Sequence, residues 1–195
     1  MLGLLIVVLL FVFTFFIEKM TGLKPTVDYN NKFEYIPIIT ANIYADLLII
    51  FATFAKIFVD VKFLETWYKK YRLSAMIADI LIGVLYILLG RYLVFKSGLQ
   101  IGLTAFAAVC VTIQIIFDFL FYIFFSSIPR GANDMLDFFK GYAKEAGVNA
   151  LLGDSFLVIM AVTMSALLNQ TSYDTNIVFL IMSIYLTPYL IYMKD

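Results

Sequence analysis

Long apolar runs separated by short polar segments dominate the chain. A transmembrane helix needs about 20 mostly apolar residues to cross the hydrocarbon core of a bilayer, and the runs are close to this length. They predict membrane-spanning helices at 2–17, 43–64, 74–95, 101–125, 150–168 and 176–192. We therefore expect an all-α, polytopic transmembrane helix bundle of about six spans, in which residues 1–195 form a single integral membrane domain.

The first apolar run, 2–17, is short and is followed directly by Glu18 and Lys19. A run of this length would also suit a signal peptide. However, no Lys or Arg precedes it and no small-residue cleavage site follows it, and a signal peptide requires both features. We interpret the run as an uncleaved first span.

The connection before the fifth span has a different pattern. Residues 129–131 (Pro-Arg-Gly) end the fourth helix, and Asn133 can cap a new one. Within 133–147 the apolar residues recur at helical spacing and the charged residues fall on the opposite face. The segment thus predicts one amphipathic helix at the membrane interface. It could bind a partner protein, but a connector on the membrane surface is the simpler interpretation.

Composition narrows the function classes. Hydrophobic residues make up 63% of the chain and charged residues 14%, against about 25% charged in a typical soluble domain. Basic and acidic residues both number 14, so no net positive charge attracts nucleic acid. The chain has no His, and Cys110 is its only Cys, which excludes disulfides, His-based metal ligation and His acid–base catalysis. No motif predicts a cofactor or a resident metal, and an enzyme that uses carboxylates alone is the weakest alternative.

Basic residues are more frequent in the segments that follow spans two and four than in the other connections. By the positive-inside rule, those segments and both termini are predicted on the cytoplasmic side. The sequon Asn169-Gln170-Thr171 then falls on the outer side, almost against the membrane. We expect Asn169 to be an ordinary polar residue of the loop that carries no glycan.

Charged residues inside the predicted spans are the strongest pointers to function, because each costs at least ~2.5 kcal/mol near the centre of a helix in lipid. Each such residue should therefore face a partner or a water-filled cavity. If spans two and three turn near Lys69, Asp46 lies level with Arg91. Their equal depth in the membrane predicts a structural ion pair between the two residues.

Other charged and polar residues of spans two to five are predicted to face the bundle interior. The predicted ion or proton pathway consists of Lys56, Asp60, Asp79, Gln114, Asp118, Tyr122 and Asp154. In this hypothesis Asp79 and Asp118 bind or relay a small cation or a proton, with Lys56 as their counter-charge. Gln114 and Tyr122 orient the two carboxyl groups, because they lie four residues from Asp118 on the same helix face.

Residues 116–154, with the sequence IFDFLFYIFFSSIPRGANDMLDFFKGYAKEAGVNALLGD, resemble uncharacterised polytopic membrane proteins of large DNA viruses and some algae. The resemblance implies a viral or eukaryotic membrane setting and brings no catalytic residues with it. Two functions follow from the sequence. One is a small-cation or proton channel or transporter that uses intramembrane carboxylates. The other is a non-catalytic membrane structural or assembly protein, whose buried charges only specify helix packing.

Overall fold

The computed structural model describes residues 2–57 and 62–193. Their helices are α1 (Leu2–Thr21), α2 (Tyr35–Phe54), α3 (Lys62–Tyr71), α4 (Leu73–Ser97), α5 (Leu103–Ser127), α6 (Asp134–Ala146), α7 (Val148–Leu168) and α8 (Tyr173–Ile191). A short 3-10 turn, η1 (Lys32–Glu34), leads into α2. The described residues contain no strand. The predicted all-α fold class is confirmed.

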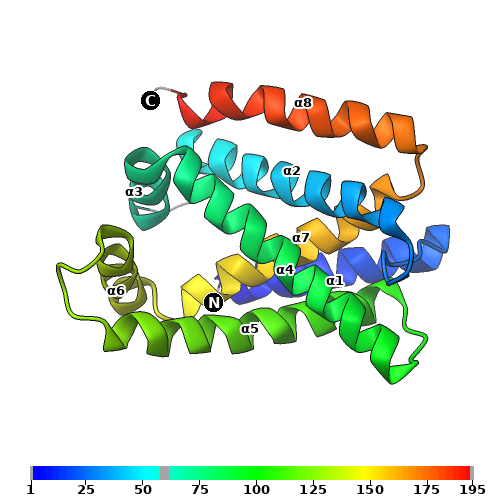
Figure 1. The fold of residues 1–195 in the computed structure, drawn as a ribbon, viewed down its shortest axis with the longest axis horizontal. Coiled ribbons are helices and arrows are strands. Elements are labelled where there is room, and N and C mark those ends of the chain that lie inside the picture. Colours follow the sequence, from blue (N-terminus) through cyan, green and yellow to red (C-terminus); the bar gives the residue numbers. More distant parts are fainter. Residues whose placement is uncertain (1, 58–61, 194–195) are drawn as a thin grey trace.

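Six helical segments are long and apolar enough to cross a membrane: α1, η1 with α2, α4, α5, α7 and α8. They form a polytopic bundle, and the shorter helices α3 and α6 stand across one end of it (Figure 1). We call this the α3–α6 end. Helix α1 begins and α8 ends on the same side of the bundle (Figure 1). The placement of that side in the cytoplasm stays a prediction.

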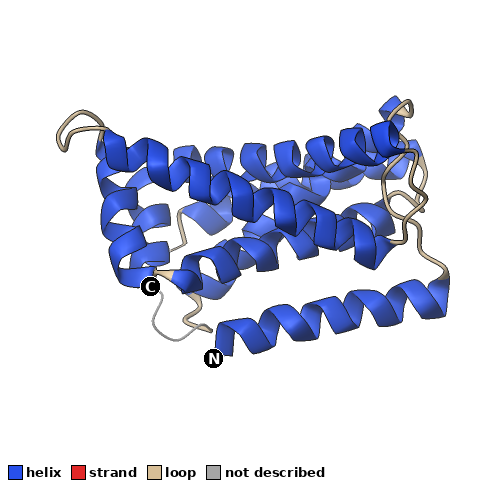
Figure 2. Cartoon of the chain, turned by 90° about the horizontal axis from the view of Figure 1, so that it is seen from below, coloured by secondary structure: helices blue, strands red, loops and turns tan. Residues whose placement is uncertain are grey.

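Helices α2 and α7 form the centre of the bundle. Helix α2 packs against α4, α7 and α8, and α7 also packs against α1 and α5. Most of α2 is buried, whereas α1, α5 and α8 expose large apolar side chains along much of their length. Helix α1 lies along the margin of the bundle, as Figure 2 shows for the helix beside the N-terminal mark. Polar side chains on α2 therefore need partners within the protein.

The second span differs from its predicted range of 43–64, because α2 covers Tyr35–Phe54. The chain leaves the helix at Lys56, whose φ of 55° is left-handed, and resumes as α3. The early start is compatible with Pro37, since proline in the first turn of a helix forfeits no hydrogen bond. The predicted range of 43–64 left Pro37 outside the span, and it divided α3 between the end of the span and the connection after it.

The predicted amphipathic segment 133–147 contains α6. The Asn133 side chain accepts the N–H groups of Met135 and Leu136 at 2.9 and 3.1 Å, as predicted for an N-cap. The apolar face of α6 packs on protein: the Phe138 and Phe139 rings lie 5.3 and 4.9 Å from the Trp67 ring of α3. Helices α3 and α6 thus form a joint aromatic layer at their end of the bundle.

The Asp137 carboxylate anchors the loop before α6. It accepts the Gly131 N–H at 2.6 Å and lies 3.1 Å from the Lys140 ammonium. The hydrogen bond from Gly131, assisted by Lys140, holds the pKa of Asp137 below its usual value. Because the folded pKa is the lower one, the anchor is fully formed above the ordinary carboxyl pKa and is lost as pH falls through the lowered folded pKa.

We expect Asp137→Asn to lower the hydrogen-exchange protection of the Gly131 amide at neutral pH, and to remove the loss of protection that wild type shows on acidification. Hydrogen exchange read by mass spectrometry across residues 129–134 checks this. Asp134→Asn is the matched control, since it removes a charge from the same first turn without removing the acceptor of Gly131. Equal protection in wild type and Asp137→Asn would contradict the prediction.

Candidate functional site

The position of α2 decides which of its side chains lie level with those of α4. Helix α2 ends and α4 begins at the α3–α6 end. At a rise of 1.5 Å per residue, Asp46 lies about 12 Å before that end of α2, and Asp79 about 9 Å after the start of α4. By the same count Glu34 is level with Arg91 near the opposite end of the bundle. The register therefore places Asp46 beside Asp79 and Arg91 beside Glu34.

The ion pair predicted between Asp46 and Arg91 is replaced by one between Glu34 and Arg91. Arg91 Nη2 lies 3.1 Å from Glu34 Oε2 and also donates to the main-chain oxygens of Asp28 and Asn31. Arg91 is 1% exposed and Glu34 4%. The prediction was wrong because it extended the second span through the residues that form α3, which shifted the count along α2 by about three turns.

Asn169 belongs to the same polar cluster. Its Nδ2, the atom that a glycan would occupy, donates to Glu34 Oε1 at 3.4 Å. The Glu34 carboxylate thus binds Arg91 through one oxygen and Asn169 through the other. This contact gives Asn169 a structural role between α2 and α7.

Two residues of the predicted pathway lie apart from its carboxyl groups, and a third is not described by the structure. Lys56 is exposed in the turn after α2, because the helix ends before it, so it is not a buried counter-charge. Tyr122 is 51% exposed, and its ring packs edge-on against Phe125 with the centroids 5.5 Å apart. It therefore does not orient Asp118. Asp60 lies outside the described residues.

Four spans each contribute one carboxyl group to the half of the bundle nearer the α3–α6 end. Asp46 lies within electrostatic reach of Asp79, and Asp154 within reach of Asp79 and Asp118. We call these four residues the carboxyl cluster. The helical spacing predicted that Asp79, Asp118 and Asp154 converge, whereas Asp46 was predicted to pair with Arg91.

Asp118 is held by side chains from its own helix and from α4. Tyr86 donates its hydroxyl to Asp118 Oδ1 at 3.1 Å, and Gln114 Nε2 donates to Oδ2. Gln114 is fully buried, and its Oε1 accepts the Ser155 hydroxyl at 2.8 Å. Gln114 therefore orients Asp118, as the helical spacing indicated, and also links α5 to α7. Ser155 was not predicted, because only the packing of α7 on α5 brings it there.

Helix α3 supplies the hydrogen-bond donors to the carboxyl groups of α2 and α4. Trp67 Nε1 donates to Asp79 Oδ2 at 2.9 Å, and the Tyr68 hydroxyl donates to Asp46 Oδ1 at 2.7 Å. Burial, reinforced by the nearby carboxyl groups, raises the pKa of Tyr68 well above its usual value, so the hydroxyl keeps its proton. The hydropathy pattern predicted neither donor, because Trp67 and Tyr68 fall in the connection after the predicted second span.

A small cavity lies between Asp46 and Asp79. Its volume is about 20 Å³, and it is lined by Asn42, Asp46, Asp79 and Gly83 together with apolar side chains of α2 and α7. A cavity of roughly 10–15 Å³ or more can hold one water molecule. Asp46 Oδ2 is buried and has no hydrogen-bond partner within the described ranges. The cavity therefore lies beside a buried carboxyl group that is only partly satisfied by hydrogen bonds.

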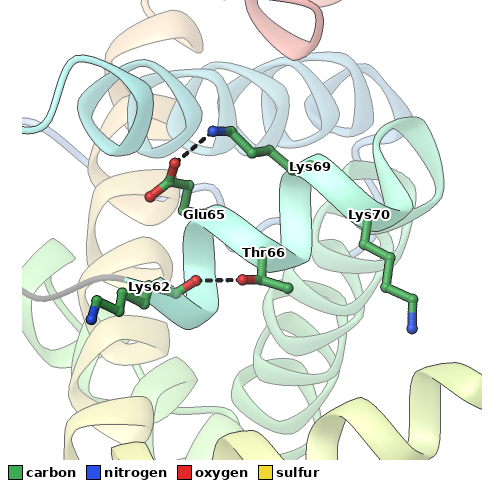
Figure 3. A pocket seen from close by; sticks show the side chains of 5 residues that line it. All are labelled: Lys62, Glu65, Thr66, Lys69 and Lys70. Carbon is green, nitrogen blue, oxygen red and sulfur yellow. Dashed lines mark hydrogen bonds and ion pairs between the residues drawn. The ribbon is translucent and has the colours of Figure 1, made fainter. Parts of the chain in front are cut away.

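A larger pocket of about 530 Å³ opens on the surface of α3 (Figure 3). Its lining residues are Lys62, Glu65, Thr66, Lys69 and Lys70. Lys69 pairs with Glu65 at 2.6 Å, and Thr66 donates to the Lys62 carbonyl at 2.7 Å. Because all the lining side chains come from one helix, the pocket is an open basic surface and has no enclosing walls.

In the part of the chain that the structure describes, no three Asp, Glu or Cys side chains are grouped to hold a metal ion. The carboxyl cluster is thus not a multidentate carboxylate cage. A scan against protein-family models found no match, and searches of the curated proteins and of the solved structures found no similar protein. The assignment of function accordingly comes from the geometry of this cluster.

Proposed function

We propose that this six-span membrane protein transports protons or a small cation through the carboxyl cluster. The observation that carries the proposal is the convergence of carboxyl groups from α2, α4, α5 and α7, held by Trp, Tyr and Gln donors. None of these hydrogen bonds neutralises a carboxylate. The only buried Arg in the described spans gives its charge to Glu34.

The chemistry of such a cluster favours proton or cation exchange. Neighbouring carboxyl groups share a proton more readily than they are both ionised, so in the proposal Asp118 and Asp154 pass a proton between them. Carboxyl chains of this kind serve as proton relays in pumps and transporters, because an uncompensated charge in the membrane interior is costly. Tyr86 and Gln114 keep the Asp118 carboxyl group in place while the proton moves.

The two ends of the bundle differ in a way that suits a gated pathway. The cluster lies about 9–14 Å from the α3–α6 end, counted along the helices that carry it. At the other end, Arg91 binds Glu34 and the main chain of the connection between α1 and α2. In the proposal, ions enter the cluster past α3 and α6. The contacts of Arg91 with Glu34 and the main chain, which we call the Arg91 plug, form the barrier to the opposite side.

The test is flux into liposomes that contain a pH-sensitive dye, with imposed gradients of protons and alkali cations. We expect Asp118→Asn and Asp79→Asn to lower wild-type flux by about tenfold or more, which corresponds to about 1.4 kcal/mol or more in barrier height. Asp174→Asn, on an exposed site in the first turn of α8, should keep wild-type flux.

Size-exclusion profiles and thermal melts must show that each variant is folded. The proposal would be wrong if liposomes that contain the wild-type protein showed no more flux than empty liposomes, across several cations and both gradient directions. Full flux in folded Asp118→Asn would also contradict it.

A structural or assembly protein of a membrane is the second candidate. The same interhelical hydrogen bonds could serve only to specify packing, and the basic surface of α3 suits anionic lipid headgroups. In that function the polar face of α6, in the segment 133–147, would bind a partner protein, since its apolar face is covered by α3 and α5. The absence of flux, with folding intact, would favour this candidate.

A further inference from the structure

Helix α3 has two faces of different chemistry. Trp67 and Tyr68 are buried and donate hydrogen bonds to carboxyl groups of the bundle. The opposite face carries the pocket of about 530 Å³ in Figure 3, whose exposed lining residues are Lys62, Thr66, Lys69 and Lys70. A ligand can therefore reach the pocket without displacing α3 from the bundle.

The basic charge of this pocket is part of a difference between the two ends of the bundle. At the α3–α6 end, residues 55–57, 62–72 and 128–147 hold eight Lys or Arg and four Asp or Glu. The connections at the opposite end, residues 22–34, 98–102 and 169–172, hold two of each kind. The α3–α6 end is also the one predicted to face the cytoplasm, and the cytoplasmic leaflet carries anionic lipids that attract basic segments.

Two of the three pocket lysines have no carboxylate partner in the described structure. Lys69 pairs with Glu65 at 2.6 Å, whereas no ion pair among the described residues includes Lys62 or Lys70. The lining residues, three Lys and one Glu, carry a net charge of +2. A Lys ammonium binds a phosphate group as a point charge, so the pocket suits a phosphate anion.

The position of α3 favours a lipid as the source of that phosphate. Helix α3 lies between the end of one span at Phe54 and the start of the next at Leu73. The pocket is thus at the level where the spans leave the hydrocarbon core, which is where lipid headgroups lie. Trp67 and Tyr71 of α3 are aromatic residues of the kind that concentrates at this level.

The open shape of the pocket also suits a lipid. All the lining side chains come from α3, so nothing encloses a ligand. A soluble anion held by so few contacts binds weakly. A lipid is confined to the level of the pocket by its acyl chains, and this confinement raises the effective concentration of its headgroup.

We propose that the outer face of α3 binds the phosphate headgroup of an anionic membrane lipid, with Lys62 and Lys70 as the charged ligands. The site follows from the charge and position of α3, and it does not depend on transport through the carboxyl cluster. Trp67 and Tyr68 extend from the same helix, so a headgroup that holds α3 also stabilises their hydrogen bonds to Asp79 and Asp46.

Native mass spectrometry of the full-length protein in mixed micelles measures the binding of phosphatidylglycerol. Phosphatidylcholine is the reference, because its choline balances the phosphate charge. We expect wild type to prefer phosphatidylglycerol and the double variant Lys62→Gln with Lys70→Gln to lose about tenfold or more in affinity, since each Lys near headgroups contributes about fivefold. Glu65→Gln removes the negative charge of the pocket and should tighten binding, an effect that misfolding does not produce.

Two control variants each remove two exposed basic charges outside α3. Arg130→Gln with Lys144→Gln changes the same end of the bundle, and Lys24→Gln with Lys32→Gln changes the opposite end. Both should keep the wild-type affinity to within about threefold, because salt screens charges beyond about 8–10 Å. The melting temperature is a second readout: phosphatidylglycerol should raise it in wild type and in both controls, and not in the α3 double variant.

The outcomes separate this inference from the proposed function. A preference for phosphatidylglycerol that the α3 double variant loses and both controls keep supports the site. Equal losses in the α3 variant and in Arg130→Gln with Lys144→Gln, or no preference over phosphatidylcholine, overturn it. Displacement of the bound lipid by inorganic phosphate overturns it as well, since the ligand is then a soluble anion. Lipid binding without liposome flux keeps the site and removes the transport function, and flux without lipid preference does the reverse.

Discussion

Replacing Arg91 with Met is expected to lower the free energy of unfolding by about 3–5 kcal/mol, the cost of breaking a buried ion pair from one side. The substitution keeps most of the side-chain volume but leaves the Glu34 carboxylate, 4% exposed, without a counter-charge. It also removes the donor to the main-chain oxygens of Asp28 and Asn31. The connection between α1 and α2 should then become sensitive to protease.

Equilibrium unfolding of the purified protein in mixed micelles measures this effect. The matched control is the double variant Glu34→Gln with Arg91→Met, which has no uncompensated charge and should recover about half of the loss or more. Arg91→Lys should fall between wild type and Arg91→Met, since it keeps the charge but not the several donors of the guanidinium group. A single Arg91→Met variant within about 1 kcal/mol of wild type would show that the plug contributes little.

Gly90→Ala is expected to destabilise the contact between α4 and α5 by about 1–3 kcal/mol, the usual cost of overpacking a core. A Cβ atom at this position would lie 2.9 Å from Cys110 Sγ and 3.2 Å from a ring carbon of Phe106. Both neighbours are fully buried, so neither side chain can move into open space. Small residues at such crossings allow two membrane helices to approach closely.

Gly153→Ala is the control for this substitution. Gly153 also lies in a helix, but a Cβ atom there meets nothing within 4 Å, so Ala should be neutral or should stabilise by up to about 1 kcal/mol through its helix propensity. Adding Cys110→Ala to Gly90→Ala should restore part of the lost stability, because it removes the sulfur that the new methyl group meets. Thermal melts of wild type and these three variants test both statements. Equal stability of Gly90→Ala and wild type would rule out a tight crossing.

Local sequence pattern predicted much of the bundle because the membrane imposes strong local rules. Helices α1, α4, α5, α7 and α8 each begin and end within about four residues of a predicted span, since backbone groups in lipid must be bonded within the helix itself. The cap at Asn133 and the amphipathic face of α6 are likewise local features. The convergence of Asp79, Asp118 and Asp154 followed from helical spacing and antiparallel order.

The second span shows where local pattern is insufficient. Its apolar run continues to Leu64 in the sequence, yet α2 ends at Phe54. The aromatic residues that follow belong to α3, whose Trp67 packs on α6 and donates to Asp79. Those contacts join residues far apart in the sequence, so no window along the chain contains the information. The error in one boundary also produced the wrong partner for Arg91.

Hydropathy and helical period depend only on neighbouring residues, so the amino-acid sequence was sufficient to predict a multi-span helical bundle with carboxyl groups inside its spans. The partners of the buried polar side chains depend on the packing of the helices: Glu34 for Arg91, Tyr68 for Asp46, and Ser155 for Gln114. A hydrogen bond or an ion pair forms only when the packing of two helices brings the donor and acceptor atoms to about 3 Å from each other. That alignment follows from where each helix ends and how it packs.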